Sequence, residues 1–447
     1  MWNRVNLCDF LKQRKEQVLI ESDIEYSLVT ISNRGEVKLR EKKKGGLINA
    51  QKGYCVKAGD FIYSRLAVHT GAFGIIPRTL DGALVTNEMP SFEINDSKIH
   101  PDILISLLSI PAVKWQLNQL TKGMGRVRIK ESMLLALTVL LPPRKEQDGL
   151  ARKISSTNIK LNKLNSQLTH QQTLLKKLRQ QILQEAIEGK LTIDFRAQNP
   201  DIEPAGELLA RIKAEKEKLI KEKKIKKQKP LPPIREEEKP FELPEGWVWC
   251  RLQDITRLIT DGKHGDCQNM FNSGYYFLSA KDIQNGELIY NNARQIVPDE
   301  FQEVHNRTDL EPGDICMVNT GATVGKTALA PDHSFTRKTT FQKSVAVIKV
   351  VKPNIDQRFI KILLVCETSK LLATSWGSAI NNLLLGDLKK QLVPLPPLPE
   401  QKAIATKVEK LLAICDQLEA QITTNQTHTE QLMQAVLKEA FSQSGEA

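Results

Sequence analysis

Long apolar runs are missing from this chain of 447 residues. No stretch reaches the ~18 consecutive apolar residues that a transmembrane helix needs. The start, MWNRVNLCDFLKQRKEQ, lacks the apolar core of a signal peptide. We therefore expect a protein that does not enter membranes. Its 40% of hydrophobic residues is enough to build the cores of roughly two to four domains.

Cysteine is scarce and scattered. The seven cysteines are odd in number and never spaced as Cys-x-x-Cys, which argues against a disulfide framework or a zinc module and predicts a reducing cytoplasm. His264 and Cys267 in HGDC could form half of a metal site. No second pair accompanies them, so we expect a polar loop and no bound metal.

The common catalytic and nucleotide-binding motifs are also absent. The chain has no Gly-x-Gly-x-x-Gly after a strand, no Gly-x-Ser-x-Gly elbow and no His-Glu-x-x-His. TGATVGKTA at 320–328 resembles a P-loop, but only three residues separate Gly321 from Gly325 where the motif requires four. Although a catalytic triad assembled in space would leave no such trace, we predict a binding protein with no catalytic residues and no cofactor of its own.

Aromatic residues are few and positive charge is in excess. Aromatics make up 5% of the chain, which argues against stacking platforms for single-stranded nucleic acid. The net charge of +12 suggests a polyanionic partner, but half of the excess lies in residues 211–240, which carry twelve basic and six acidic side chains and several prolines. That composition is typical of a solvated helix that runs into a linker.

An internal duplication organises the chain. LLPPRKEQDGLARKISSTN at 140–158 is matched by PLPPLPEQKAIATKVEKLL at 394–412, an offset of 254 positions. The same offset places Gly59-Asp60 on Gly313-Asp314 and Glu185-Ala186 on Glu439-Ala440. Because the offset holds across distant blocks, the two halves are predicted to be structural repeats.

Each repeat ends in a predicted long helix that a Pro-Pro pair introduces. Apolar residues recur every seven positions, as in a coiled coil. In the first helix they are Ile154, Leu161, Leu168, Leu175 and Ile182, with Leu164 and Leu178 at the companion position. In the last helix they are Val408, Cys415, Ile422 and Val436, with Leu411, Leu418 and Leu432 beside them.

A helix of about 40 residues is ~60 Å long and needs a partner of equal length. Antiparallel pairing of the two helices would make the molecule pseudo-twofold symmetric, and duplex DNA is the commonest ligand of that symmetry. Gln171 and Asn425 lie near the helix centres, so they either form a buried polar pair that fixes the register or face solvent.

These patterns predict an α+β fold: two globular mixed α/β domains, separated by two long helices that form an antiparallel coiled-coil spacer. The expected segments are a first mixed domain at 1–141, a central helical region and linker at 142–240, a second mixed domain at 241–395 and a C-terminal helical region at 396–447.

The duplicated PP-x-x-EQ entry into a long helix resembles the specificity subunits of type I restriction-modification systems. The order of mixed domain and helix, twice, is similar as well. FELPEGWVWCRLQDI looks like the start of a target recognition domain of that family, and DGKHGDC, YYFLSAKDI and PGDICMVNTGATVGKTA look like blocks inside one. The resemblance covers essentially the whole chain and is weakest in the first domain.

The resemblance implies a non-catalytic subunit that binds double-stranded DNA. Each target recognition domain would read one half of a bipartite, asymmetric sequence, and the helices would set the gap and dock two methyltransferase (modification) subunits. Those partners would bind S-adenosylmethionine and methylate adenine. Restriction and translocase subunits would add ATP- and Mg-dependent cleavage of unmethylated DNA.

Candidate DNA contacts follow from the chemistry of base and phosphate recognition. In the first domain GRVRIK (125–130) alternates, so a strand would place Arg126, Arg128 and Lys130 on one face, as would an ordinary solvated strand. REKKKGG (40–46) is typical of a DNA-facing loop or of a surface turn. The other candidates are Lys42, Lys43 and Lys44 in that segment, and Lys263, His264, Lys281, Lys326, Arg337 and Lys338 in the second domain.

Two alternatives stay open on the sequence alone. A coiled-coil scaffold with two domains for ligands other than DNA would show no salt-dependent DNA affinity. An enzyme that used the Gly-Lys-Thr segment would depend on Lys326.

Overall fold

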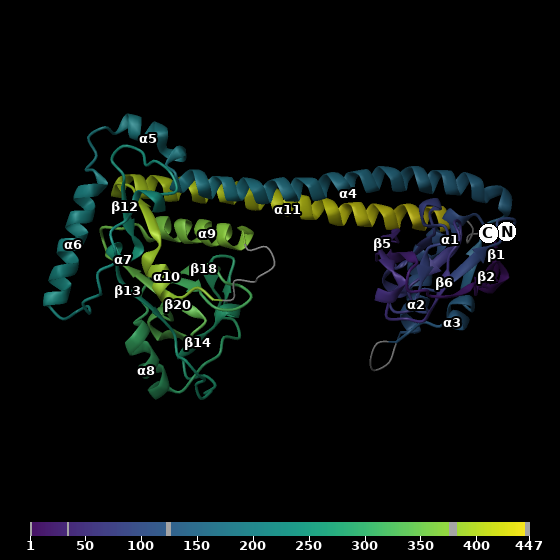
Figure 1. The fold of residues 1–447 in the computed structure, drawn as a ribbon, viewed down its shortest axis with the longest axis horizontal. Coiled ribbons are helices and arrows are strands. Elements are labelled where there is room, and N and C mark those ends of the chain that lie inside the picture. Colours follow the sequence, from purple (N-terminus) through teal and green to yellow (C-terminus); the bar gives the residue numbers. More distant parts are fainter. Residues whose placement is uncertain (1, 34, 122–126, 375–381, 443–447) are drawn as a thin grey trace. The chain divides into compact units, whose positions relative to one another are not determined.

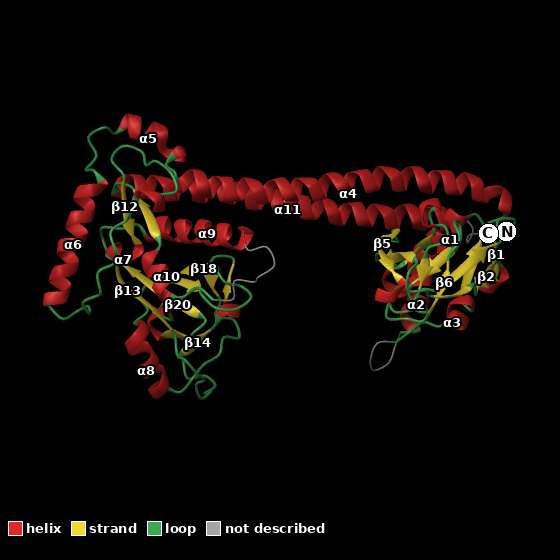
Figure 2. Cartoon of the chain, in the orientation of Figure 1, coloured by secondary structure: helices red, strands yellow, loops and turns green. Residues whose placement is uncertain are grey.

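The computed structural model describes residues 2–33, 35–121, 127–374 and 382–442. They form two compact units, which are described separately: Met1–Gln171 with Gln421–Ala447, and Gln172–Ala420. Each unit combines a mixed domain with one part of each long helix (Figures 1 and 2). No helix among the described residues has the length and apolarity required to cross a membrane.

The two long helices, α4 (Arg144–Ile187) and α11 (Leu398–Ser442), are nearly equal in length, with 44 and 45 residues. In the first unit Lys153 of α4 forms an ion pair of 3.0 Å with Glu439, near the end of α11. In the second unit Arg179, late in α4, bonds Asp416 at 2.6 Å and Glu419 at 3.0 Å. The predicted antiparallel pairing is therefore confirmed in both units.

The seam between the helices buries one residue per heptad from each helix. In α4 these are Ile154, Leu161, Leu168, Leu175 and Ile182, and in α11 they are Val408, Cys415, Ile422 and Thr429. Val436 continues the series but is only half-buried, and the neighbouring Leu437 is buried instead. The sequence therefore predicted the central row of the seam correctly, except for its last turn.

The companion row is more exposed than we expected. Leu164, Leu178, Leu418 and Leu432 are 40–52% exposed. Gln171 and Asn425 belong to the same row and are exposed, so of the two alternatives they face solvent and do not form a buried polar pair. The physical reason is that two helices alone are too narrow to cover a second row. The buried polar residue of the seam is Thr429, whose hydroxyl donates to the Asn425 carbonyl at 2.7 Å.

The mixed domains share a four-stranded antiparallel sheet of the same order. It is β2-β10-β7-β8 in the first unit and β13-β20-β17-β18 in the second, and each unit adds a two-stranded ladder, β1-β11 or β12-β21. The strands of the first unit are β1 (Asn3–Asn6), β2 (Leu11–Arg14), β7 (Phe61–Tyr63), β8 (Phe73–Ile75), β10 (Ser91–Ile94) and β11 (Thr138–Leu141). Those of the second are β12 (Val248–Arg251), β13 (Thr256–Asp261), β17 (Ile315–Val318), β18 (Thr327–Leu329), β20 (Val345–Val350) and β21 (Leu392–Leu395).

The structure confirms the duplication down to the register of one hairpin. Phe61 pairs with Ile75 in β7-β8, and Ile315 pairs with Leu329 in β17-β18, which is the same pairing shifted by 254. The short helices α3 (Glu131–Leu135) and α10 (Leu385–Lys390) begin at positions related by the same shift. They follow α1 (Pro101–Ser109) and α2 (Pro111–Gln119) in the first unit and α9 (Gln357–Thr374) in the second.

The units differ at two places in each four-stranded sheet: between its first two strands along the chain, and between its hairpin (β7-β8 or β17-β18) and its last strand. The first unit builds a five-stranded sheet there, in the order β3-β6-β9-β4-β5. Its strands are β3 (Gln17–Leu19), β4 (Glu25–Ile31), β5 (Val37–Lys44), β6 (Lys52–Cys55) and β9 (Leu84–Val85). The second unit instead has α8 (Pro298–Thr308) and the pairs β14 (Tyr276–Leu278) with β19 (Thr339–Phe341) and β15 (Ile283–Gln284) with β16 (Glu287–Leu288). The repeats therefore share a frame and differ in what is inserted into it.

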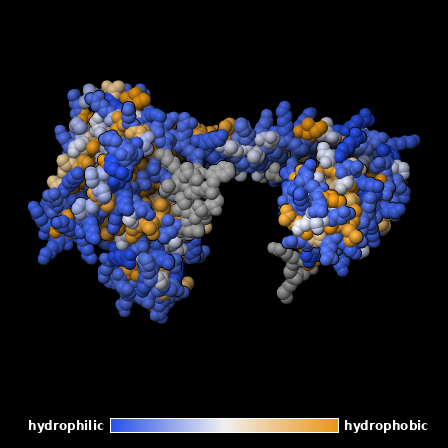
Figure 3. Space-filling view, viewed as in Figure 1, coloured by the Kyte–Doolittle hydropathy of each residue, from blue (hydrophilic) through white to orange (hydrophobic). Residues whose placement is uncertain are grey.

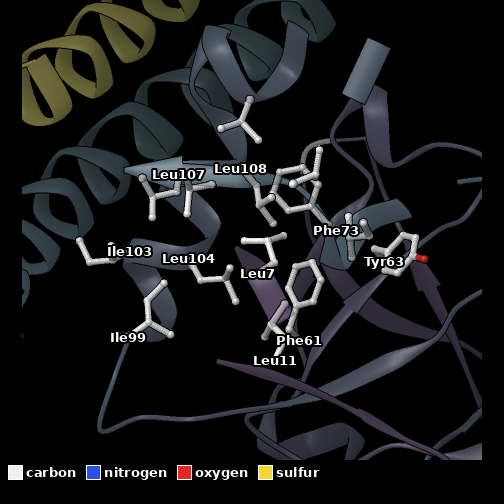
Figure 4. Packing of buried hydrophobic residues seen from close by; sticks show 14 of the residues in the cluster. Leu7, Leu11, Phe61, Tyr63, Phe73, Ile99, Ile103, Leu104, Leu107 and Leu108 are labelled. Carbon is white, nitrogen blue, oxygen red and sulfur yellow. The ribbon is translucent and has the colours of Figure 1, made fainter. Parts of the chain in front are cut away.

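The core of the first unit joins sheet and helices. Leu7, Phe61, Leu104 and Leu107 are fully buried in one cluster, in which the aromatic rings of the sheet face the leucines of α1 (Figure 4). Ile154 of α4 is in the same cluster. Because α4 contributes to this core, the start of the long helix is fixed to the mixed domain.

The Glu-Gln pair at the start of each long helix has a structural role. Gln147 accepts a hydrogen bond from the His100 amide at 2.8 Å and donates to the Pro142 carbonyl at 2.9 Å. Gln401 does the same with the Asp356 amide and the Pro396 carbonyl, both at 2.9 Å.

The glutamates beside them also have matching partners. The Trp2 indole donates to Glu146 at 3.2 Å, and the Trp247 indole donates to Glu400 at 2.8 Å. The Glu-Gln pair thus connects the start of each long helix to two segments of its own mixed domain: the glutamate bonds a tryptophan near the start of the domain, and the glutamine bonds a backbone amide further along it.

The segment between α4 and β12 consists of short helices followed by a proline-rich stretch. It contains α5 (Ile193–Gln198) and α6 (Ala205–Lys221), and it leads through proline-rich residues to the short helix α7 (Leu252–Ile255) after β12. Arg196 of α5 pairs with the buried Glu400 at 2.5 Å, so this segment contributes to the start of α11 in the second unit.

Candidate nucleic-acid interface

One end of each four-stranded sheet gathers several loops, and we call it the hairpin edge. In the second unit it comprises residues 262–264, 319–326, 342–344 and 382–384. Backbone hydrogen bonds hold these loops together: Lys263 donates to the Phe341 carbonyl at 2.8 Å, and Lys343 donates to the Lys263 carbonyl at 3.0 Å. Asn319 donates to the Ser344 carbonyl at 3.0 Å. The edge is therefore a fixed surface built from distant segments.

Four of the predicted cations lie at or beside this edge. Lys263 is 3.3 Å from Glu303 and 3.8 Å from Glu300, while His264 is exposed and lies 3.1 Å from Asp261. Lys326 is exposed at the end of the β17-β18 hairpin loop. Lys281 follows β14, whose Leu278 carbonyl accepts from the Gln342 amide at 2.9 Å.

Arg337 and Lys338 are placed elsewhere. They lie in a 3-10 turn before β19, and Arg337 is 3.9 Å from Glu311. Glu311 precedes β17 and so lies at the opposite end of the sheet from the β17-β18 hairpin. The structure therefore does not bring these two cations to the hairpin edge.

In the first unit the hairpin edge comprises residues 64–72, 87–90 and 127–130. Arg65 donates from its amide to the Glu88 carbonyl at 2.9 Å, and the Ile129 amide donates to the Arg65 carbonyl at 2.9 Å. Arg128 and Lys130 are exposed on either side of the buried Ile129. Residues 127–130 form no strand, so the predicted strand was wrong there, and Arg126 lies outside the described residues.

Lys42, Lys43 and Lys44 end strand β5, so the predicted loop was also wrong. β5 is the outer strand of the five-stranded sheet, and Lys44 pairs with Glu25 of β4. Lysines on an outer strand discourage edge-to-edge pairing with other sheets. These three residues lie on a different sheet from the one whose hairpin edge carries Arg128 and Lys130.

The two hairpin edges match residue for residue at one point. The Ile129 amide donates to the Arg65 carbonyl at 2.9 Å, and the Leu383 amide donates to the Asn319 carbonyl at 2.7 Å. Both pairs are related by the 254-residue offset. Arg65, Asn319 and Asn382 are missing from the candidates predicted from the sequence, although the 254-residue offset aligns Arg65 with Asn319 and Arg128 with Asn382.

The Gly-Lys-Thr segment is part of this hairpin and not a P-loop. Lys326 leads directly into strand β18, whereas a P-loop must lead into a helix whose N-terminus faces the phosphates. Gly325 has a positive φ of 93°, and a Cβ there would lie 2.3 Å from Cγ2 of Thr368 in α9. The glycine is therefore required for close packing of the hairpin against the helix.

The Gly-Asp turn before the hairpin is also scaffold. Asp314 is 1% exposed and lies 3.1 Å from the buried Lys349 of β20. Burial raises the pKa of the Asp314 carboxyl, and the Lys349 charge offsets part of that rise. In the first unit the matched Asp60 accepts from Arg14 of β2, with Nη2 to Oδ1 at 3.0 Å. The same carboxylate is thus neutralised from different strands in the two repeats.

His264 and Cys267, which the sequence offered as half of a metal site, have ordinary surroundings. His264 lies beside Asp261, and Cys267 is buried, which raises the pKa of its thiol to about 11. Within the described ranges, no group of three or more His, Cys, Asp or Glu side chains is arranged to hold a metal ion.

The long helices expose apolar side chains besides those of the seam. Ile159 and Leu164 of the first unit are 67% and 40% exposed. In the second unit the residues are Leu174, Leu178, Ile414 and Leu418, at 42–53%. Hydrophobic groups are visible along these helices in the space-filling view (Figure 3).

Comparison with known proteins gives a consistent result. Residues 244–425 match the family model described as the type I restriction modification DNA specificity domain. The specificity subunit of the type I restriction enzyme EcoAI from Escherichia coli is 35% identical over 260 residues, which cover 55% of this chain and 41% of that protein. The EcoBI specificity subunit, also from Escherichia coli, is 23% identical over 411 residues, 91% of this chain and 78% of that protein.

The chain spans about two fifths of the length of EcoAI and of the similar EcoEI subunit. A solved structure on complex assembly and conformational transition of the type I restriction-modification system contains a chain of similar fold. Its TM-score is 0.67 at 17% identity, over 98% of this chain and 97% of that chain. On these findings the second half of the chain matches the type I restriction modification DNA specificity domain, and the chain is similar to specificity subunits of type I restriction enzymes.

Proposed function

We propose that this chain is the non-catalytic subunit that selects the DNA sequence for a type I restriction-modification complex. Residues 1–141 and 241–395 act as two target recognition domains, each of which reads one half of a bipartite, asymmetric site in double-stranded DNA. The observation that carries the proposal is the hairpin edge, which both repeats build on the same frame from different exposed side chains. A shared frame with different exposed chemistry suits two domains that read different sequences.

The cations at these edges suit a DNA surface. Lys130 and Lys326 are exposed at the two edges and can contact phosphates, which fix position without reading sequence. Lys263 and His264 are held by carboxylates, which orients them. Asn, Arg and Thr side chains at the same edges supply the hydrogen-bonding groups that base edges require.

The exposed leucines of α4 and α11 support docking of modification subunits. Two modification subunits, one for each repeat, would cover matched rows on the paired helices. S-adenosylmethionine, ATP and Mg belong to the partner subunits in this proposal, as does the methylation of adenine. Restriction and translocase subunits would join the same complex.

The experiment is a single-molecule methylation map of host DNA, with and without this gene. The expected result is a bipartite adenine-methylation motif that disappears with the gene. An unchanged map, together with no salt-dependent binding of the purified complex to duplex DNA, would refute the proposal and favour a scaffold for other ligands. Lys326→Ala serves as a test of nucleotide chemistry, because an enzyme that used this lysine would lose all activity.

A further inference from the structure

Residues 128 and 382 occupy the same place in the two repeats and differ in chemistry. They are related by the 254-residue offset, and each directly precedes the residue whose amide bonds the hairpin, Ile129 or Leu383. Both side chains are exposed. The frame around them is therefore repeated, while Arg stands in one copy and Asn in the other.

The Arg128 side chain is oriented by a carboxylate that belongs to its own edge. Its Nε donates to both oxygens of Glu88 at 3.0 Å, and the side chain remains 55% exposed. Its two terminal nitrogens have no hydrogen-bond partner within the described part of the chain. A guanidinium held at Nε presents these two donors as a planar pair, which matches O6 and N7 of guanine.

The Asn382 side chain is oriented in a comparable way. Its Oδ1 accepts from the Thr320 hydroxyl of the hairpin loop at 2.9 Å, and Asn382 and Thr320 also form a backbone bridge. The amide nitrogen has no partner among the residues that the structure describes, and Oδ1 keeps a second lone pair. One donor and one acceptor side by side match N7 and the N6 amino group of adenine.

We propose that Arg128 and Asn382 are matched base-reading residues, with Arg128 specifying a guanine in one half-site and Asn382 an adenine in the other. This assignment rests on the proposed function and adds the residue and the base class to it. Support from Glu88 and Thr320 holds each side chain before DNA arrives, which lowers the entropic cost of a specific contact. Lys130 and Leu384 also occupy matched positions and differ in chemistry. The exposed Lys130 suits a phosphate, and Leu384, which is 58% exposed, suits a thymine methyl group.

The test uses the whole complex, with the chain and its modification partner expressed in a host that lacks adenine methylation. Wild type, Arg128→Ala and Asn382→Ala are mapped by single-molecule sequencing. Asn382→Ala is expected to relax one adenine position of one half-site, with a loss of preference of roughly 5- to 150-fold. Arg128→Ala is expected to relax one guanine position of the other half-site. The gap and all remaining positions stay unchanged.

Matched variants separate reading from folding. Thr320→Ala removes the support of Asn382 and is expected to relax the same adenine position to a smaller extent. Lys130→Ala is expected to slow methylation of all sites equally. A wild-type map without a bipartite motif would refute the proposed function itself. A wild-type motif that both alanine variants leave fully specified would overturn only this assignment, and so would relaxation of several positions at once.

Discussion

Replacement of Gln401 by leucine provides a local test of how each long helix is fastened to its domain. The Gln401 side chain is fully buried, and it satisfies the Asp356 amide and the Pro396 carbonyl at 2.9 Å each. Leucine has a similar volume but no polar atoms, so both backbone groups would lose their partner. A buried unsatisfied group costs about 1–3 kcal/mol. The two groups together predict a loss of about 2–6 kcal/mol in the second unit.

The assay is hydrogen exchange of the full chain, read at the Asp356 amide. Since about 1.4 kcal/mol corresponds to a factor of ten, exchange at Asp356 should accelerate by roughly 30-fold or more. The His100 amide, which Gln147 holds in the first unit at 2.8 Å, should keep its protection. Gln401→Glu keeps the acceptor but not the donor, so its exchange rate at the Asp356 amide should lie between those of wild type and Gln401→Leu. Equal exchange at Asp356 in wild type and Gln401→Leu would refute the role of this residue as a fastener.

Three further outcomes are expected. Leu168→Asp should disrupt the helix seam because Leu168 is only 3% exposed, and circular dichroism should show a loss of helix content. Leu164 is 40% exposed, so Leu164→Asp should keep the helices paired and weaken only the binding of modification subunits, as measured by native mass spectrometry of the complex. Lys349→Met should destabilise the second unit by about 3–5 kcal/mol, seen as loss of exchange protection in β17, because three carboxylates lose their buried cation. Burial lowers the pKa of His305 below its unfolded value of about 6.5, so the folded state binds fewer protons than the unfolded state. The free energy of unfolding should therefore fall as the pH falls below about 6.5. In a His305→Gln variant, denaturant unfolding at several pH values should show a smaller fall.

The sequence predicted the long helices well because their periodicity is a local property. The seven-residue spacing of Leu161 and Leu168 predicts a helix seam, and both residues are buried in the structure. The sequence could not determine that Leu164 and Gln171 would be exposed at the edge of the seam, because their exposure depends on how many helices pack together. That number is a property of the assembly and not of one helix.

The hairpin edge was harder to predict, because backbone hydrogen bonds between distant loops create it. Lys263 and Lys326 reach the same surface only through the pairing of β13, β20 and β17. The alternation in GRVRIK had a physical basis, since Ile129 is buried between exposed neighbours, but residues 127–130 belong to no sheet. Charge alone also chose Arg337, which lies beside Glu311.

The different cations that serve Asp60 and Asp314 limit how the two halves of this chain can exchange parts. If β2 of the first unit were replaced by β13, Asp60 would lose Arg14, and β10, with the sequence SFEI, contains no lysine to take its place. If β20 were replaced by β10, Asp314 would lose Lys349 in the same way. A recombined gene would then carry a carboxylate buried without compensation, which is strongly destabilising. Crossovers that fall outside the whole domain keep each turn with its own cation, so recombined chains should fold stably when they exchange complete domains and not when they exchange single strands.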